Sequence, residues 1–251
     1  MQNAKHLTAV GLDGDATKRS KVAGNRVMAL WRTLIGKKIV MAVTGVVLIG
    51  FIIAHMLGNL KMFSGPDEIN AYSKFLREVG QPELAYGQLL WIVRIVLLVC
   101  VALHITAAVQ LTLMSRAARP VGYTVKKNIE TTFAARVMRW GGVLLAVFVI
   151  FHLLHLTGGV VGFEAGQFKH LAVYQNVMAA FHVWPVAIFY LVAMAALCLH
   201  LGHGIWSLLQ TLGWSTARNE AMLKTVSWII AIVVFAGFSS IPVAVMAGWL
   251  N

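Results

Sequence analysis

The chain has 251 residues, of which 59% are hydrophobic and 12% are charged. A soluble domain of this size carries about twice that charged fraction, which excludes a soluble enzyme. The net charge of +12 would suggest a nucleic acid or anionic lipid partner in a soluble protein. Here the basic residues lie between long apolar runs and are better explained by membrane topology.

Five apolar runs are long enough to cross about 30 Å of hydrocarbon. Because backbone polar groups in lipid need partners within their own segment, each run is expected to be an α-helix. The sequence therefore predicts an all-α membrane protein with five transmembrane helices. The expected spans are residues 39–57, 89–114, 140–161, 177–206 and 226–249.

A basic tail, residues 1–32, precedes the predicted five-helix domain, residues 33–251. The tail does not resemble a cleavable signal peptide, since the first apolar run starts near residue 39 and lacks a small-residue cleavage site. Segments 1–38 and 116–139 hold eight and six Lys or Arg residues, whereas the last span ends without a charge. This asymmetry predicts a cytoplasmic N-terminus and a C-terminus outside.

Histidines recur in the first four spans, where such a residue is costly and usually has a partner or a function. At 1.5 Å of rise per residue, they fall at two depths separated by roughly 15 Å. His55 and His152 form the outer pair, and His104 and His200 form the inner pair. Two histidines at one depth on facing helices suit bis-imidazole ligation of a b-type haem, with each nitrogen about 2 Å from iron. We therefore expect the first four helices to form a bundle around two b haems.

Small residues follow or precede each of these histidines at helical spacing. They would allow the helices to stand apart around a flat macrocycle, although small residues also let transmembrane helices pack closely. Their recurrence beside all four histidines favours the haem interpretation. These residues are Gly58, Ala107, Ala108, Gly159, Ala196 and Gly204.

Three further histidines lie near the pairs. His155 and His203 each follow a pair member by three residues, so either member of each doublet can bind iron on spacing alone. The spare histidine would be a hydrogen-bond donor, a haem-propionate partner or part of a quinone site. His182 precedes His200 by 18 residues, five helical turns, and is expected on the same face at the outer end of span four. It is either an interface histidine or a quinone or propionate partner.

Arg94 is the only cation well inside a span, and no Asp or Glu occurs in any span. An arginine within a membrane needs an anionic partner, for which a propionate of the outer haem is the candidate. The alternative is that Arg94 extends to the outer interface. Two polar sets are candidates for a quinone site, the outer one being favoured because it lies beside the distal haem. The outer set consists of Lys61, Glu68, Tyr72, Arg94 and His155. The inner set consists of Trp206, Ser207 and Gln210.

Three stretches resemble a known family: GKKIVMAVTGVVLIGFIIAHMLGNLKMF (Gly36–Phe63), FHLLHLTG (Phe151–Gly158) and LHLGHGIWSLLQTLGW (Leu199–Trp214). They are similar to the cytochrome b membrane anchor of succinate dehydrogenase/fumarate reductase complexes, in its single-subunit, five-helix, two-haem form. The resemblance covers residues 33–250.

The resemblance implies a ligand set and a pairing. His104 and His200 would hold the haem nearer the iron–sulfur subunit, and His55 and His152 the distal one. His155 and His203 would then be neighbours of the ligands and would not bind iron.

The family also implies a place for the chain in a complex. A flavoprotein and an iron–sulfur subunit would dock on the cytoplasmic side of a bacterial inner membrane. Electrons would pass through the inner and then the outer haem to a quinone, which two-haem anchors usually take as menaquinone. Some relatives have a Glu just before the inner ligand of span four for proton transfer, whereas this chain has Leu197, Cys198 and Leu199. We expect no proton path of that kind.

Other functions remain as alternatives. One is a two-haem cytochrome b anchor of a different respiratory complex, such as a hydrogenase or formate dehydrogenase. Another is a haem-free, quinone-binding structural anchor. A transporter should show broken spans in paired halves. Pro185 and Pro242 are expected to break spans four and five, but no paired halves are visible.

Overall fold

The computed structural model describes residue 26, residues 28–118 and residues 133–250. Within these ranges the chain is helical and contains no strand. Five helices are long and apolar enough to cross a membrane, which confirms the predicted class. Most of the predicted tail and residues 119–132 of the basic loop lie outside the described residues. The five helices are α2 (Leu34–Asn59), α4 (Gln88–Ala117), α5 (Phe133–His152), α7 (Trp184–Thr211) and α8 (Glu220–Met246).

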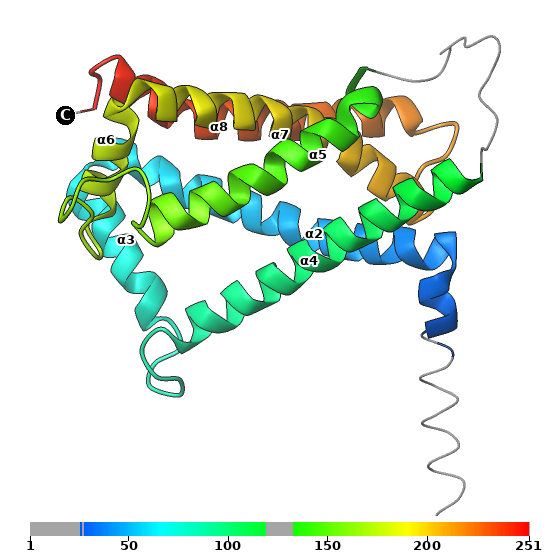
Figure 1. The fold of residues 1–251 in the computed structure, drawn as a ribbon, viewed down its shortest axis with the longest axis horizontal. Helices are drawn as coiled ribbons and strands as arrows, with labels where there is room; N and C mark the ends of the chain where they lie inside the picture. The colour runs from blue at the N-terminus through cyan, green and yellow to red at the C-terminus, as the bar shows by residue number, and fades with distance from the viewer. Residues whose placement is uncertain (1–25, 27, 119–132, 251) are drawn as a thin grey trace, which may run out of the picture.

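The helices pack as two groups that meet at α2 and α7. Helix α4 packs on α2, while α7 lies between α5 and α8. Helix α2 also contacts α7 and α8, which joins the groups (Figure 1). Two short helices, α3 (Pro66–Glu78) and α6 (Val173–His182), contact each other at one end of the molecule, where the chain also ends.

Local signals set the ends of α2 and the start of α3. The Thr33 hydroxyl accepts a hydrogen bond from the Gly36 amide at 2.9 Å, capping the first turn of α2. A short 3-10 helix, η1 (Leu60–Ser64), ends at Gly65, whose φ of 97° suits glycine. Helix α3 then begins with a proline and two acidic residues in its first turn, which the helix dipole favours.

The predicted third span, 140–161, was wrong at its end. Helix α5 closes in a single π-helical turn, η2 (Leu153–Thr157), and the chain leaves the helix at Gly158. In a π-turn each backbone hydrogen bond spans five residues, one more than in an α-helix. The side chains of this turn therefore depart from the 3.6-residue spacing that the prediction assumed.

The predicted fourth span, 177–206, was wrong at its start. Helix α6 ends at His182, Val183 is extended with φ of −83° and ψ of 95°, and α7 begins at Trp184. Pro185 lies in the first turn of α7, where its missing amide costs nothing. Its ring and missing donor prevent α6 from continuing into α7. Pro242, by contrast, lies inside α8, which continues to Met246, so it does not end that span as expected.

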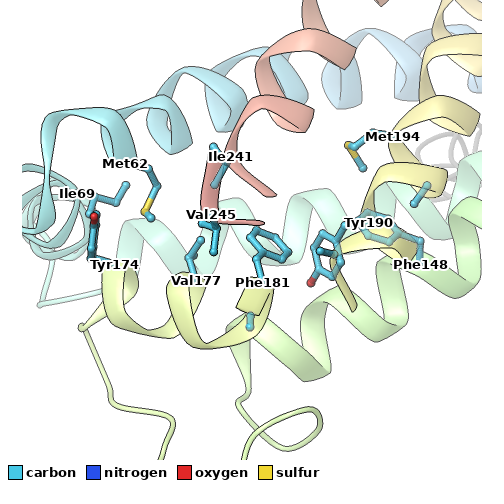
Figure 2. Close-up of a cluster of buried hydrophobic side chains, with 13 residues drawn as sticks. Met62, Ile69, Phe148, Tyr174, Val177, Phe181, Tyr190, Met194, Ile241 and Val245 are labelled. Atoms are coloured by element: carbon cyan, nitrogen blue, oxygen red, sulfur yellow. The ribbon is translucent and has the colours of Figure 1, made fainter. Parts of the chain in front are cut away.

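Buried apolar side chains form two clusters. The first lies at the α3–α6 end, where α6, α7 and α8 meet and Phe181 lies beside Tyr190 (Figure 2). The second lies along α2, α7 and α8 and includes Leu201 and Val234. On α4, by contrast, only Ala107 is buried. The exposed faces remain apolar, as a lipid-facing surface requires.

Candidate functional site

The outer pair consists of two imidazoles from different helices. The rings of His55, on α2, and His152, at the end of α5, have centroids 5.9 Å apart and are inclined by 75°. Phe51 stacks on His55 with centroids 5.2 Å apart, and Phe148 stacks on His152 at 5.7 Å. Phe238 brings α8 to the same level, 5.8 Å from His55. Aromatic side chains thus surround the pair.

The inner pair joins α4 to α7. The rings of His104 and His200 have centroids 6.3 Å apart and are inclined by 52°. His104 Nδ1 lies 3.2 Å from the Thr44 hydroxyl, which donates to the Val40 carbonyl at 2.8 Å. The hydroxyl therefore accepts from His104 Nδ1–H, which leaves Nε2 of the neutral ring unprotonated. His200 Nδ1 is buried and has no hydrogen-bond partner among the described residues.

These dimensions fit a bis-imidazole haem. Two nitrogens at about 2 Å on opposite sides of one iron bring the ring centroids to roughly 6 Å. The centroid distances of 5.9 and 6.3 Å both agree with this value. In the described part of the chain, no group of three or more His, Cys, Asp or Glu side chains is arranged around one point. Two facing imidazoles do form the complete protein ligand set of a six-coordinate haem iron.

A cavity adjoins the inner pair between α5 and α7. His200 lines it, together with the small residues Gly141 and Ala196. Ala196 was predicted to make room beside His200, and it borders this space. The remaining lining is apolar, from Val137, Met138 and Leu199. The cavity therefore offers an apolar surface next to an imidazole, as the edge of a macrocycle requires.

Two other small residues serve different neighbours from those predicted. A Cβ on Gly58 would come 2.7 Å from the ring of Tyr72, so this glycine admits the Tyr72 ring. Gly159 lies beyond the helix, with φ of 62°, and a Cβ there would collide with Phe168. The helical spacing failed at Gly159 because the helix ends before it. Gly45 also approaches the inner pair, since a Cβ added there would lie 3.8 Å from His104 Cε1.

His155 differs sharply from its neighbour in the doublet. Its side chain is fully buried, with ring contacts to Phe151 and Phe163 at 5.1 and 4.9 Å. Its Nδ1 lies 3.0 Å from the Tyr190 hydroxyl, and its Nε2 has no partner in the described chain. The Tyr190 hydroxyl also lies 3.3 Å from His152 Nδ1. One buried hydroxyl therefore joins both members of the doublet.

The other two extra histidines have ordinary surroundings. His203 contacts the ring of Trp206, with centroids 5.8 Å apart. His182 is exposed, and its Nδ1 donates to the Met178 carbonyl at 2.7 Å. The expectation that His182 shares the helix face of His200 was wrong, because α6 and α7 are separate helices. Its role at the outer edge stays a prediction.

Arg94 lies over an aromatic ring. Its guanidinium carbon is 5.0 Å from the centroid of Trp91, one turn earlier on α4. The side chain is only partly buried. This cation–π contact accommodates the charge near the start of α4, and the propionate contact stays a prediction.

Three of the outer quinone candidates, Lys61, Glu68 and Tyr72, lie close together. Lys61 Nζ lies 3.5 Å from a Glu68 carboxylate oxygen and 5.7 Å from the centre of the Tyr72 ring. All three residues belong to η1 and α3, at the end of the molecule that follows His55 in the chain. This arrangement supplies a cation, an anion and an aromatic face within one small area.

The inner quinone candidates share the last part of α7. The Trp206 ring lies beneath Lys224, whose Nζ is 4.5 Å from its centroid, and Trp206 Nε1 is buried without a described partner. Ser207 accepts from the Thr211 hydroxyl through its carbonyl, and Gln210 is exposed. No side-chain hydrogen bond joins Trp206, Ser207 and Gln210 to one another in the described residues.

Two residues near the pairs were missed in the sequence, Thr44 and Tyr190. Thr44 follows no obvious pattern, since a threonine within an apolar helix is common. Tyr190 carries a weak signal, because it precedes His200 by ten residues, or about 15 Å of helix. That is the predicted distance between the two levels. A search of the known protein families, of curated proteins and of solved structures finds no match for this chain.

Proposed function

We propose that this chain is the membrane-anchoring cytochrome b subunit of a succinate:quinone oxidoreductase. The observation that carries the proposal is the occurrence of two imidazole pairs, at 5.9 and 6.3 Å, on helices apolar enough to cross a membrane. The resemblance of three long stretches to that family supports the choice of complex. The chain would anchor the soluble subunits and conduct electrons between them and a quinone.

The four paired histidines would hold two b haems, His104 with His200 and His55 with His152. A bound b haem supplies one-electron transfer. The chain's own residues would supply the nitrogens that hold the iron, orient them and keep water away. Thr44 fixes the protonation of one inner ligand, and Phe51, Phe148 and Phe238 cover the outer pair with apolar rings. Axial ligands, their hydrogen bonds and local burial are the means by which a protein sets a haem potential.

The partners follow from the proposed orientation, with the N-terminus in the cytoplasm of a bacterial cell. A flavoprotein and an iron–sulfur subunit would dock at the end where α2 begins and α7 ends. Menaquinone would react at the opposite end, beside Lys61, Glu68 and Tyr72. In that set an ion pair lies next to an aromatic ring. This arrangement supports the set as a binding site for a quinone, whose flat ring has polar oxygens at its edge.

A pyridine haemochrome assay on the complex purified from membranes tests the proposal. We expect about two b haems per chain, together with flavin from a co-purified subunit. One haem would mean that one pair does not bind iron. No haem would refute the electron-transfer role and favour a haem-free anchor, whereas two haems without flavin would indicate another respiratory complex. His170→Ala, at an exposed histidine outside both pairs and outside the five apolar helices, is the control and should retain both haems.

A further inference from the structure

The Tyr190 hydroxyl lies between two imidazole nitrogens of the FHLLHL segment. It is 3.3 Å from His152 Nδ1 and 3.0 Å from His155 Nδ1. The tyrosine is buried in α7, and its ring is packed between Phe148 and Phe181, each with its centroid 5.0 Å away. This packing holds the hydroxyl in place between the two histidines.

Two arrangements of this group give the buried hydroxyl hydrogen an acceptor. A phenol donates one hydrogen and accepts others, and a neutral imidazole carries one N–H. In the first arrangement, His152 Nδ1–H donates to the Tyr190 oxygen, which donates to His155 Nδ1. In the second, both bonds are reversed, and the hydrogen of His152 is on Nε2. The two arrangements therefore differ in which nitrogen of His152 is free.

Of these two, only the first leaves His152 Nε2 able to bind a metal. An imidazole binds through an unprotonated nitrogen, and a hydrogen bond at the other nitrogen selects it and orients the ring. Resting on the proposed function, we infer that Tyr190 is a positioning residue for His152. Its hydroxyl accepts from His152 Nδ1–H and donates to His155 Nδ1, so that His155 completes the chain of hydrogen bonds without touching the haem.

The surroundings of His155 keep this chain of hydrogen bonds fixed. The π-turn η2 carries His155 inward, where it is fully buried between Phe151 and Phe163. Gly162, with φ of 77°, passes so close that a Cβ would lie 2.7 Å from His155 Cδ2 and 2.9 Å from Nε2. The ring thus has little room to turn away from Tyr190.

Tyr190→Phe tests the inference, because it removes the hydroxyl and retains the ring in its aromatic cluster. We expect both haems to bind, with a changed electron paramagnetic resonance signal and a higher midpoint potential for the outer haem alone. The potential rises because an imidazole that loses its hydrogen-bond acceptor becomes a weaker donor to iron. An unchanged outer haem in a variant that binds two haems would overturn the inference. A wild-type complex without haem would instead refute the proposed function.

Two variants of His155 test the inference independently, and they still do so if the Tyr190→Phe complex does not assemble. His155→Leu removes the acceptor for the Tyr190 hydroxyl, which is then free to donate to His152 Nδ1. It should shift the outer haem in the same direction, and His155→Gln, which retains an acceptor, should restore part of the shift. The shift in the double variant Tyr190→Phe/His155→Leu should equal that of Tyr190→Phe alone. A normal outer haem in His155→Leu, or additive shifts, would overturn the inference.

Discussion

Around the outer pair, aromatic rings from α2, α5, α7 and α8 contact the imidazoles, whereas the inner pair has small and aliphatic neighbours. Among the described residues, His104 and His200 make ring contact only with each other. Each pair has one histidine bound to a hydroxyl, Tyr190 at the outer level and Thr44 at the inner level. The Thr44 hydroxyl also forms a hydrogen bond to a carbonyl of its own helix, whereas the Tyr190 hydroxyl lies within hydrogen-bond distance of a second buried histidine. Two histidine pairs are thus placed in different environments, and two haems bound to them would differ in potential.

Removal of one imidazole should cause the largest change, because it should leave one level with haem and the other without. His152→Ala and His200→Ala should each abolish one haem and leave the other, halving the haem content per chain. The levels are separate because each imidazole faces only its own partner at 5.9 or 6.3 Å. The measurement is the haemochrome absorbance against protein in the purified complex. Loss of both haems from either variant, in a complex that keeps its flavin, would contradict the independence of the two levels.

Thr44→Val should weaken the inner haem without affecting the outer one. It replaces the hydroxyl by a methyl group of similar size and removes the hydroxyl acceptor of His104 Nδ1–H. Loss of a hydrogen bond of this kind typically lowers the affinity for the metal about 10–100-fold. Haem retention during titration with a competing apo-globin measures the change.

Thr106→Val is the matched control for this variant. Thr106 also lies inside a span, and its hydroxyl likewise donates to the carbonyl four residues earlier, at 2.7 Å. Because it is exposed and has no bond to histidine, its replacement should leave haem affinity unchanged. Equal effects of the two substitutions would show that the Thr44 bond to His104 is unimportant.

Gly202→Ala should destabilise the helix packing beside the inner level. Its new Cβ would lie 2.8–2.9 Å from the indole of Trp228, at the contact of α7 with α8. Overpacking of this kind costs about 1–3 kcal/mol. Thermal unfolding in detergent should show the loss, whereas Gly50→Ala, with open space around its Cβ, should be neutral or stabilising. A Gly202 variant as stable as the Gly50 variant would mean that Trp228 moves freely.

Apart from the two controls, Glu220→Gln should have the smallest effect of these substitutions. Its carboxylate lies 2.6 Å from Lys224 Nζ, yet both side chains are exposed and one turn apart on α8. Exposed pairs of this type contribute about 0.5 kcal/mol or less. The midpoint of thermal unfolding should therefore hardly change, and a large shift would indicate that a partner subunit uses this charge.

The sequence predicted the features that depend on composition and regular helical rise. Five apolar helices and the grouping of four histidines by depth required only hydropathy and 1.5 Å per residue. The errors arose where the backbone departs from a regular helix. Pro185 starts a new helix and so separates His182 from α7, although a proline near the start of a span is a readable signal. The π-turn that buries His155 has no such signal in FHLLHL.

Tyr190 shows why the hydrogen-bond partners of the histidines could not be predicted. A tyrosine within an apolar run resembles any core residue, and its partners lie 35 and 38 residues earlier in the chain. Only the packing of α7 on α5 brings them together. What the four histidines bind stays a prediction that the haem assay decides.

Helix α7 carries both His200 and Tyr190, so one continuous helix determines the spacing of the two levels. Insertion of a single residue between them would turn Tyr190 by about 100° relative to His200 and detach it from the doublet. An insertion of four residues would nearly restore the direction but displace the hydroxyl by about 6 Å. Substitutions in α7 therefore leave the ten-residue interval between these side chains unchanged, whereas any insertion or deletion within it separates the two levels from their partners.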